Sequence, residues 1–138
     1  MYQELIEPYK QTALRHLTMA DILLNARFHE GAAFHVYHSY ESIICAALLK
    51  WQPYNTPPQV HSTKLNRFSN VFAKDRMLVA ESIKLSHTLL KMRNRVLYPE
   101  LRRKKVITPV AAVSARQVQK YLSQVRQFVN LVTTRLDL

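Results

Sequence analysis

The stretch that decides the fold is AAFHVYHSYESIICAALLKW, residues 32–51. Its apolar residues recur at three- and four-residue spacings, which is the period of an α-helix, and they cover much more than one stripe. Such a helix must be enclosed by other elements, so we expect it at the centre of a bundle. Pro53 is expected to stop it. The predicted inward side is Ala33, Tyr37, Tyr40, Ile44, Ala47 and Leu48, widened by Phe34, Ile43 and Cys45.

The segment before residue 32 predicts one long helix. Pro8 is compatible with its first turn, and Gly31 is expected to end it in a left-handed conformation. The inward stripe is expected at Leu14, Leu17, Asp21, Leu24 and Phe28, with Ala13 and Ala20 beside it. The proline-rich stretch PYNTPPQ, residues 53–59, is the clearest break in the chain. After it, residues 61–73 predict a short helix with Leu65, Phe68 and Phe72 inward.

Two more long helices are predicted after the short one. Asp75 is expected to be the N-cap of the first, which ends at Tyr98 because Pro99 disfavours a helical residue before it. Its buried residues are expected to be Leu78, Val79, Ile83, Leu89, Leu90 and Val96. A basic loop follows, and the last helix opens at either Thr108 or Ser114. Its buried stripe is expected at Val118, Tyr121, Leu122, Val125, Phe128, Val129 and Val132.

Composition supports an all-α fold. Gly31 is the one glycine of 138 residues, whereas β-turns, bulges and phosphate-cradling loops draw on glycine. A P-loop and a GxGxxG fingerprint each need more than one glycine, so both nucleotide-binding classes are excluded. The sequence therefore predicts a single domain, residues 1–138, folded as an antiparallel up-and-down four-helix bundle with an extra short helix.

Cys45 is the single cysteine, so an intramolecular disulfide and a CxxC zinc site are excluded, and we expect a buried thiol. His35 and His38 are three residues apart, but no acidic residue completes a metal-binding HExxH pattern. The N-terminal residues show no signal-peptide pattern, and no window has 18 uninterrupted apolar residues. We therefore expect a cytoplasmic protein with no membrane association, metal or cofactor.

Positive charge gathers in KMRNRVLYPELRRKK, residues 91–105, where seven of fifteen residues are basic and one is acidic, within a net charge of +11. Guanidinium groups bind phosphate oxygens in pairs, and a phenol stacks on a base. Two interpretations stay open: a solvated helix end, where the helix dipole favours cations, or a site for a polyanion.

Helical geometry limits which of these groups can meet. At about 100° per residue, one face of the predicted helix carries His87, Lys91, Asn94 and Tyr98, with Arg95 beside it. Arg93 lies roughly 140° from Tyr98 around the helix. The two side chains can therefore share a ligand only if the helix loosens before Pro99 or a second subunit supplies its own copy.

The order of these motifs resembles the HEPN domain family, a nucleotide-binding family of higher eukaryotes and prokaryotes that includes HepT-like helical bundles. The resemblance covers residues 20–132 and rests on GAAFHVYHSYESIICAALL (31–49), PPQVHSTKL (57–65), MRNRVLYP (92–99) and the final amphipathic helix. It implies a four-helix bundle that dimerises, so that two arginine-bearing helix ends form one cleft. Many members are metal-independent endoribonucleases, often toxins encoded beside a small nucleotidyltransferase that neutralises them.

The hallmark of the family is an arginine, a polar residue, three variable residues and a histidine. Arg93 and Asn94 match the first two positions, but Tyr98 occupies the histidine position. Attack by an RNA 2′-hydroxyl needs a group that exchanges a proton near neutral pH, which a phenol with a pKa of about 10 does poorly. The resemblance therefore implies binding rather than cleavage, and Arg93 and Tyr98 are catalytic only if the protein is active.

Three hypotheses follow for the function. The first is a catalytically degenerate homodimer that binds RNA or a nucleotide at a basic cleft of the dimer interface. Its binding residues are Arg93, Asn94, Arg95, Tyr98, Arg102, Arg103, Lys104 and Lys105. The second is a metal-independent endoribonuclease, the toxin of a toxin–antitoxin pair, in which another histidine supplies the proton. The third is an accessory subunit of a small nucleotidyltransferase.

Overall fold

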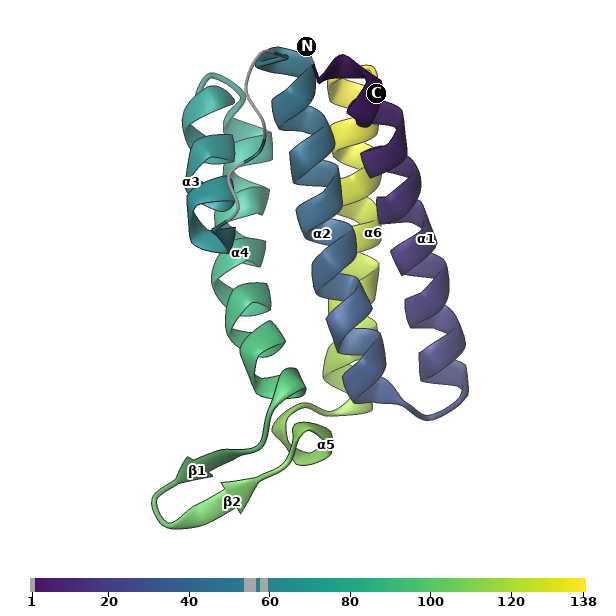
Figure 1. The fold of residues 1–138 in the computed structure, drawn as a ribbon, viewed down its shortest axis with the longest axis vertical. Coiled ribbons are helices and arrows are strands. Elements are labelled where there is room, and N and C mark those ends of the chain that lie inside the picture. Colours follow the sequence, from purple (N-terminus) through teal and green to yellow (C-terminus); the bar gives the residue numbers. More distant parts are fainter. Residues whose placement is uncertain (1, 54–56, 58–59) are drawn as a thin grey trace.

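The computed structural model describes residues 2–53, 57 and 60–138, so most of the predicted proline-rich loop lies outside the described residues. Four long helices lie side by side, and a small hairpin projects from one end of the bundle (Figure 1). The long helices are α1 (Ile6–Asn25), α2 (His29–Trp51), α4 (Arg76–Leu97) and α6 (Ala115–Arg135). The shorter elements are the 3₁₀ turn η1 (Gln3–Leu5), α3 (His61–Val71), β1 (Glu100–Arg102), β2 (Lys105–Ile107) and α5 (Pro109–Ala112). The predicted all-α helical bundle is confirmed.

Helix α2 lies at the centre of the bundle, as its sequence predicts. It packs against α1, α3, α4 and α6. Phe34 is half-buried, and all other residues of the predicted inward side are buried, including Cys45. Because each large apolar side chain removed from water contributes about 1.5–3 kcal/mol, α2 supplies much of the stabilisation of the bundle.

The turn between α1 and α2 differs from the prediction. Helix α1 ends at Asn25, and Arg27 adopts the left-handed conformation with φ of 67°. Gly31 instead lies in the first turn of α2, where a Cβ atom would meet the Cδ1 atom of Leu23 at 3.3 Å. The glycine therefore allows a close approach of α1 to α2 and does not end a helix.

The buried face of α1 is also rotated from its predicted position. Ala13, Leu17 and Ala20 are buried, whereas Leu14 is 39% and Phe28 is 56% exposed. The predicted inward positions of Leu14 and Phe28 are therefore wrong. Small alanine side chains let the backbones of α1 and α2 come close together. The stabilisation from this close packing is larger than the stabilisation that burial of the larger apolar residues on the neighbouring face would give.

Helix α4 begins and ends where the sequence predicts. The backbone N–H of Leu78 donates to Oδ1 of Asp75 at 3.2 Å, which confirms Asp75 as the N-cap, and Tyr98 is extended after the last helical residue. Ile83 is 59% exposed, so its predicted burial is wrong. It lines a shallow groove between α3 and α4, while the buried face of α4 is Leu78, Ser82, Leu85, Leu89, Met92 and Val96.

The predicted basic loop is a β-hairpin. Strands β1 and β2 are antiparallel, with Leu101 opposite Val106 and Arg102 opposite Lys105. The two turn residues, Arg103 and Lys104, have φ of 46° and 67°, the pair of positive values found in type I′ hairpin turns. Scarcity of glycine therefore did not prevent a β-turn, because two long basic residues occupy positions that usually favour Asn and Gly.

The last helix opens at Ser114, one of its two predicted starts, and Thr108 instead caps the separate short helix α5. Thr108 Oγ1 accepts from the N–H of Ala111 at 3.4 Å and caps α5. Ser114 caps α6: its Oγ accepts from the N–H of Gln117 at 3.1 Å, and its own N–H donates to Oε1 of Gln117 at 2.9 Å. This reciprocal pair is a capping box. The predicted buried stripe of α6 is confirmed, with Tyr121 half-buried.

None of the helices in the described part of the chain combines the length and apolar character that crossing a membrane requires.

Candidate nucleic-acid interface

The predicted site residues lie in separate places around the end of α4. Arg93 is on the side that faces α2, and the exposed side chain of Asn94 accepts a hydrogen bond from it. Arg95 lines a pocket toward α5 and α6. Tyr98 follows the helix and is 71% exposed, and residues 102–105 form the tip of the hairpin. The structure therefore brings these groups to one end of the molecule without gathering them in one cavity.

Arg93 is held between α4 and α2. One guanidinium nitrogen, Nη1, donates to Oδ1 of Asn94 at 3.1 Å. The guanidinium carbon lies 5.7 Å from the ring centroid of Tyr37, within range of a cation–π interaction. No ion pair joins Arg93 to a carboxylate among the described residues; Glu41 pairs with Lys64 and Glu100 with Arg102. Arg93 therefore keeps hydrogen-bond donors for an anionic ligand.

A buried ion pair lies on α2, one turn from Tyr37. Glu41 is 7% exposed, and its two carboxylate oxygens accept from Nδ1 of His61 at 2.6 Å and from Nζ of Lys64 at 2.5 Å. Burial alone would raise the pKa of Glu41, but the hydrogen bond and charge of Lys64, with smaller contributions from Tyr37 and His61, hold this pKa below its ordinary value. The ionised carboxylate therefore joins α3 to α2.

Two buried polar atoms near Arg93 have no hydrogen-bond partner among the described residues: Nε2 of His38 and Nε of Arg93 itself. Burial raises the pKa of Tyr37. Burial also lowers the pKa of His38 to about 4, against the opposing charge of Glu41. Both side chains are therefore neutral near pH 7. Unsatisfied buried polar atoms of this kind are the places where native proteins hold a water, an ion or a ligand.

Sequence reasoning did not identify Tyr37, His38 or His61 as neighbours of Arg93. The four residues come from three different helices, so no local spacing relates them. The available signal was the presence of Tyr37, His38 and Glu41, together with Ser39 and Ser42, on a helix predicted to be buried over most of its circumference. Polar groups on a face that must be buried need partners, and this requirement pointed to a polar cluster without naming its other members.

The hairpin extends the positive surface beyond the bundle (Figure 1). All four side chains of residues 102–105 are exposed. The one acidic residue of the hairpin, Glu100, contacts Nε of Arg102 at 3.1 Å and Nε of Arg95 at 3.8 Å. One carboxylate does not neutralise Arg95 and the four basic residues 102–105. The hairpin therefore keeps a net positive charge, which attracts polyanions.

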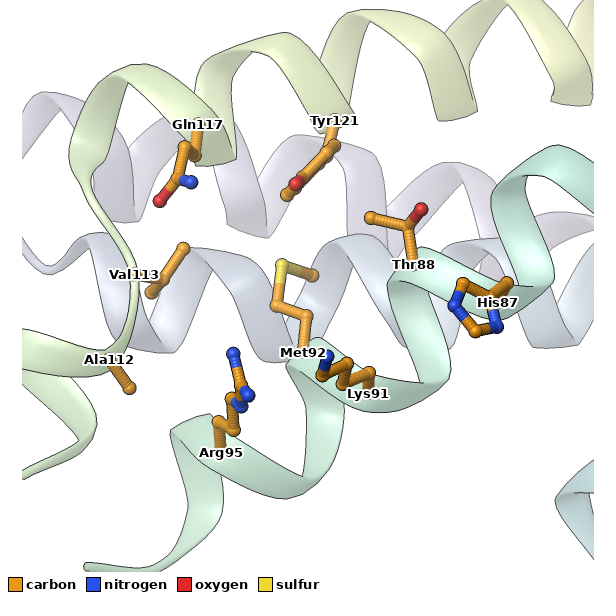
Figure 2. Close-up of a pocket in the computed structure, with 9 residues that line it drawn as sticks. All are labelled: His87, Thr88, Lys91, Met92, Arg95, Ala112, Val113, Gln117 and Tyr121. Atoms are coloured by element: carbon orange, nitrogen blue, oxygen red, sulfur yellow. The ribbon is translucent and has the colours of Figure 1, made fainter. Parts of the chain in front are cut away.

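Arg95 lines a pocket of about 270 Å³ between the end of α4 and the start of α6 (Figure 2). The pocket residues are His87, Thr88, Lys91, Met92, Arg95, Ala112, Val113, Gln117 and Tyr121. The predicted face of α4 is therefore only partly correct. His87 and Lys91 share the pocket with Arg95, whereas Asn94 contacts Arg93 and Tyr98 lies beyond the helix in an extended conformation.

Comparison with known protein families identifies the class to which this bundle belongs. Residues 6–135, nearly the whole chain, match the HEPN domain. The chain therefore belongs to the HEPN domain family, and this membership supports a function related to nucleotides or RNA. We found no significant match among the curated proteins or among the solved structures.

Proposed function

We propose that this HEPN domain binds RNA, without cleaving it, through the end of α4 and the hairpin. The observation that carries the proposal is the arrangement of the exposed arginine and lysine side chains. Residues 102–105 lie on a projecting hairpin that directly follows the helix end holding Arg93. Phosphate groups spaced along a strand match such a series of cations, and each contact releases counterions from the nucleic acid.

Tyr98 is the reason for proposing binding rather than cleavage. It stands where the family resemblance implies a histidine, and it is 71% exposed. A histidine at this position would exchange a proton near neutral pH. A solvent-exposed phenol instead suits stacking on a base.

We also propose that two copies of the chain form the binding cleft. Arg93 faces α2, whereas Tyr98 lies outside the helix, and no contact joins them among the described residues. A twofold axis near the ends of α4 would place Arg93 of one copy near Tyr98 of the other. Light scattering at micromolar concentration tests this arrangement: a dimer is expected, and a monomer would exclude a shared cleft.

The binding proposal is tested by fluorescence anisotropy with labelled single-stranded RNA. Affinity should fall steeply as salt rises, with a slope of about 0.7 in log K against log salt for each phosphate contacted. The double variant Arg102→Glu, Arg103→Glu should weaken binding at least ~10-fold, because it replaces two attractive charges with repulsive ones.

The matched control is Lys74→Glu, Arg76→Glu at the opposite end of α4. Both side chains are exposed, and the pair changes net charge by the same amount. Equal losses in the two double variants would show that binding depends on net charge and not on the hairpin. Affinity that is indifferent to salt and to both variants would reject the proposal.

One observation favours a second function, metal-independent RNA cleavage. Nε2 of His38 is buried and unpartnered beside Arg93. The guanidinium is placed to stabilise a charged phosphate. His38 can accept the 2′-hydroxyl proton only if the α2–α4 face opens to expose Nε2, and its pKa of about 4 makes it a weak general base. Labelled RNA incubated in EDTA distinguishes the functions: cleavage lost in both Arg93→Ala and His38→Ala would establish the enzyme, and intact RNA supports binding alone.

The nucleotidyltransferase partner stays a prediction from the family resemblance. Co-purification of the chain with such an enzyme is the measurement that tests it.

A further inference from the structure

We propose that the pocket between α4, α5 and α6 binds the terminal phosphate monoester of an RNA strand. This inference rests on the proposed function, RNA binding, and names the part of the RNA that the pocket selects. The pocket lies at the base of the hairpin, since α4 ends at Leu97 and α5 begins at Pro109. A strand that ends in the pocket can therefore continue along residues 102–105.

The charge of the pocket favours an anion. Lys91 and Arg95 come from α4, and Figure 2 shows the Arg95 guanidinium directed into the space between Val113 and Met92. His87 stands at the rim, and none of the described residues that line the pocket carries a carboxylate. Glu100 forms an ion pair with Nε of Arg95 at 3.8 Å, and the guanidinium itself is directed at the pocket (Figure 2).

Helix α6 adds donors on the facing wall. It begins at Ala115 with Ser114 as its N-cap, and Gln117 lines the pocket from its first turn. The N-terminus of a helix carries partial positive charge and attracts phosphate. Oε1 of Gln117 already accepts from the N–H of Ser114, so the amide nitrogen, Nε2, is the group left to donate to a ligand. The pocket therefore surrounds an anion with donors from two helices.

A chain end suits this pocket better than an internal phosphate. A terminal phosphate monoester carries about −1.5 to −2 charge near pH 7, whereas each internal diester carries −1. The volume of about 270 Å³ is below the roughly 300 Å³ at which pockets for drug-sized ligands begin. The α4, α5 and α6 walls therefore leave room for a phosphate with part of one nucleoside.

The apolar side of the pocket suits the terminal nucleoside. Met92 and Val113 are 5% and 7% exposed and form the floor, and the half-buried ring of Tyr121 stands above them (Figure 2). An aromatic face beside a cationic pair is the combination that holds a base and its phosphate together. The pocket thus provides a place for both parts of a terminal nucleotide.

The test compares one labelled RNA sequence with three kinds of end: a 5′-phosphate, a 3′-phosphate, and hydroxyl groups at both ends. Anisotropy with the full chain should show one phosphorylated form binding ~10-fold more tightly than the hydroxyl form, which is the gain expected from about 1.4 kcal/mol of charge-assisted hydrogen bonding. The preferred form identifies which end is selected. Inorganic phosphate at millimolar concentration should compete for this preference.

Variants assign the preference to the pocket. Lys91→Gln and Arg95→Gln should each reduce it, and Arg95→Lys should retain part of it, with folding verified by circular dichroism. Arg102→Glu, Arg103→Glu should weaken all three RNAs while leaving their ratio unchanged. A preference that survives in both glutamine variants would overturn the assignment.

The two proposals fail in different ways. Equal affinity for all three RNAs would overturn the terminal-phosphate inference while the proposed RNA binding stands. Absence of binding to any of the three RNAs would reject the proposed function, and the inference with it.

Discussion

At the scale of single residues, burial lowers the pKa of three histidine side chains that lie close together. His16 and His35 place their Nδ1 atoms 2.8 Å apart across α1 and α2, and the ring centroid of His16 lies 5.6 Å from that of His38. Burial lowers the pKa of all three, to about 4 for His38. One Nδ1 must be deprotonated to accept the bond between His16 and His35, so the pair requires at least one neutral ring.

These pKa values predict that the fold loses stability in mild acid. A histidine whose folded pKa is depressed contributes its full stabilisation above the unfolded value of about 6.5 and loses it as pH falls toward the folded value. The free energy of unfolding should therefore decrease from about pH 6.5 to about pH 4, and His38→Gln should flatten that decrease. Urea unfolding across this range measures it, with His87→Gln on exposed α4 surface as control. An unchanged pH profile in His38→Gln would contradict the assignment.

At the scale of elements, the N-cap of α4 also forms a contact with a neighbouring helix. Asp75 caps α4 through the N–H of Leu78, and its carboxylate also accepts from Nε of Arg135 on α6 at 2.7 Å. The pair with Arg135 and the hydrogen bond from Leu78 lower the pKa of Asp75. One side chain therefore both starts a helix and contacts its neighbour.

The cap and the ion pair of Asp75 are separable by substitution. Asp75→Ala should destabilise the protein by about 1 kcal/mol through the lost cap, while Asp75→Asn keeps a capping side chain. The ion pair is exposed to solvent and should contribute little. Urea unfolding at pH 7 should therefore place Asp75→Asn close to the wild type. A larger loss in Asp75→Asn than in Asp75→Ala would contradict the cap as the main effect.

The hairpin turn supports another prediction at the element scale. Arg103 and Lys104 both have positive φ, which L-residues with long side chains adopt at a cost of order 1 kcal/mol each. Arg103→Asn, Lys104→Gly, the sequence favoured in a type I′ turn, should slow amide hydrogen exchange in β1 and β2 and weaken RNA binding through the lost charge. Faster exchange in this variant would show that the turn is not the one described.

At the scale of the whole molecule, buried hydrogen bonds as well as the apolar core hold the helices of the bundle together. The Tyr40 hydroxyl on α2 donates to the carbonyl oxygen of Ser82 at 2.9 Å and lies 2.5 Å from Oγ of Ser86, both on α4. Its ring packs 5.1 Å from Phe128 on α6. Tyr40 therefore connects three of the four long helices.

Removing the Tyr40 hydroxyl should weaken this connection without opening a large cavity. Tyr40→Phe should lower the free energy of unfolding by about 1–2 kcal/mol, because the buried serine groups lose a partner while the ring remains packed. Tyr2→Phe, at an exposed tyrosine, is the matched control and should have no measurable effect. Equal stability of Tyr40→Phe and the wild type in urea would contradict the role of this contact.

The positions of the long helices, the Asp75 cap, the last helical residue before Tyr98 and the two serine and threonine caps were predictable because each depends on residues close together in sequence. The rotation of α1, the exposure of Ile83 and the role of Gly31 were not. These depend on which neighbouring helix each face meets, and a spacing pattern alone does not specify the neighbour. The hairpin was missed because its turn uses Arg103 and Lys104 in place of the usual turn residues.

The sequence by itself determined a helical bundle, a central apolar helix and a strongly basic segment over residues 91–105, because periodicity, capping and charge are local properties. Only the tertiary structure decided that Arg93 faces Tyr37 and His38 on α2, that Arg95 lines a pocket with Tyr121 on α6, and that the basic residues lie on a projecting hairpin. Those relations join residues from different helices, and packing of the core fixes their distance and direction.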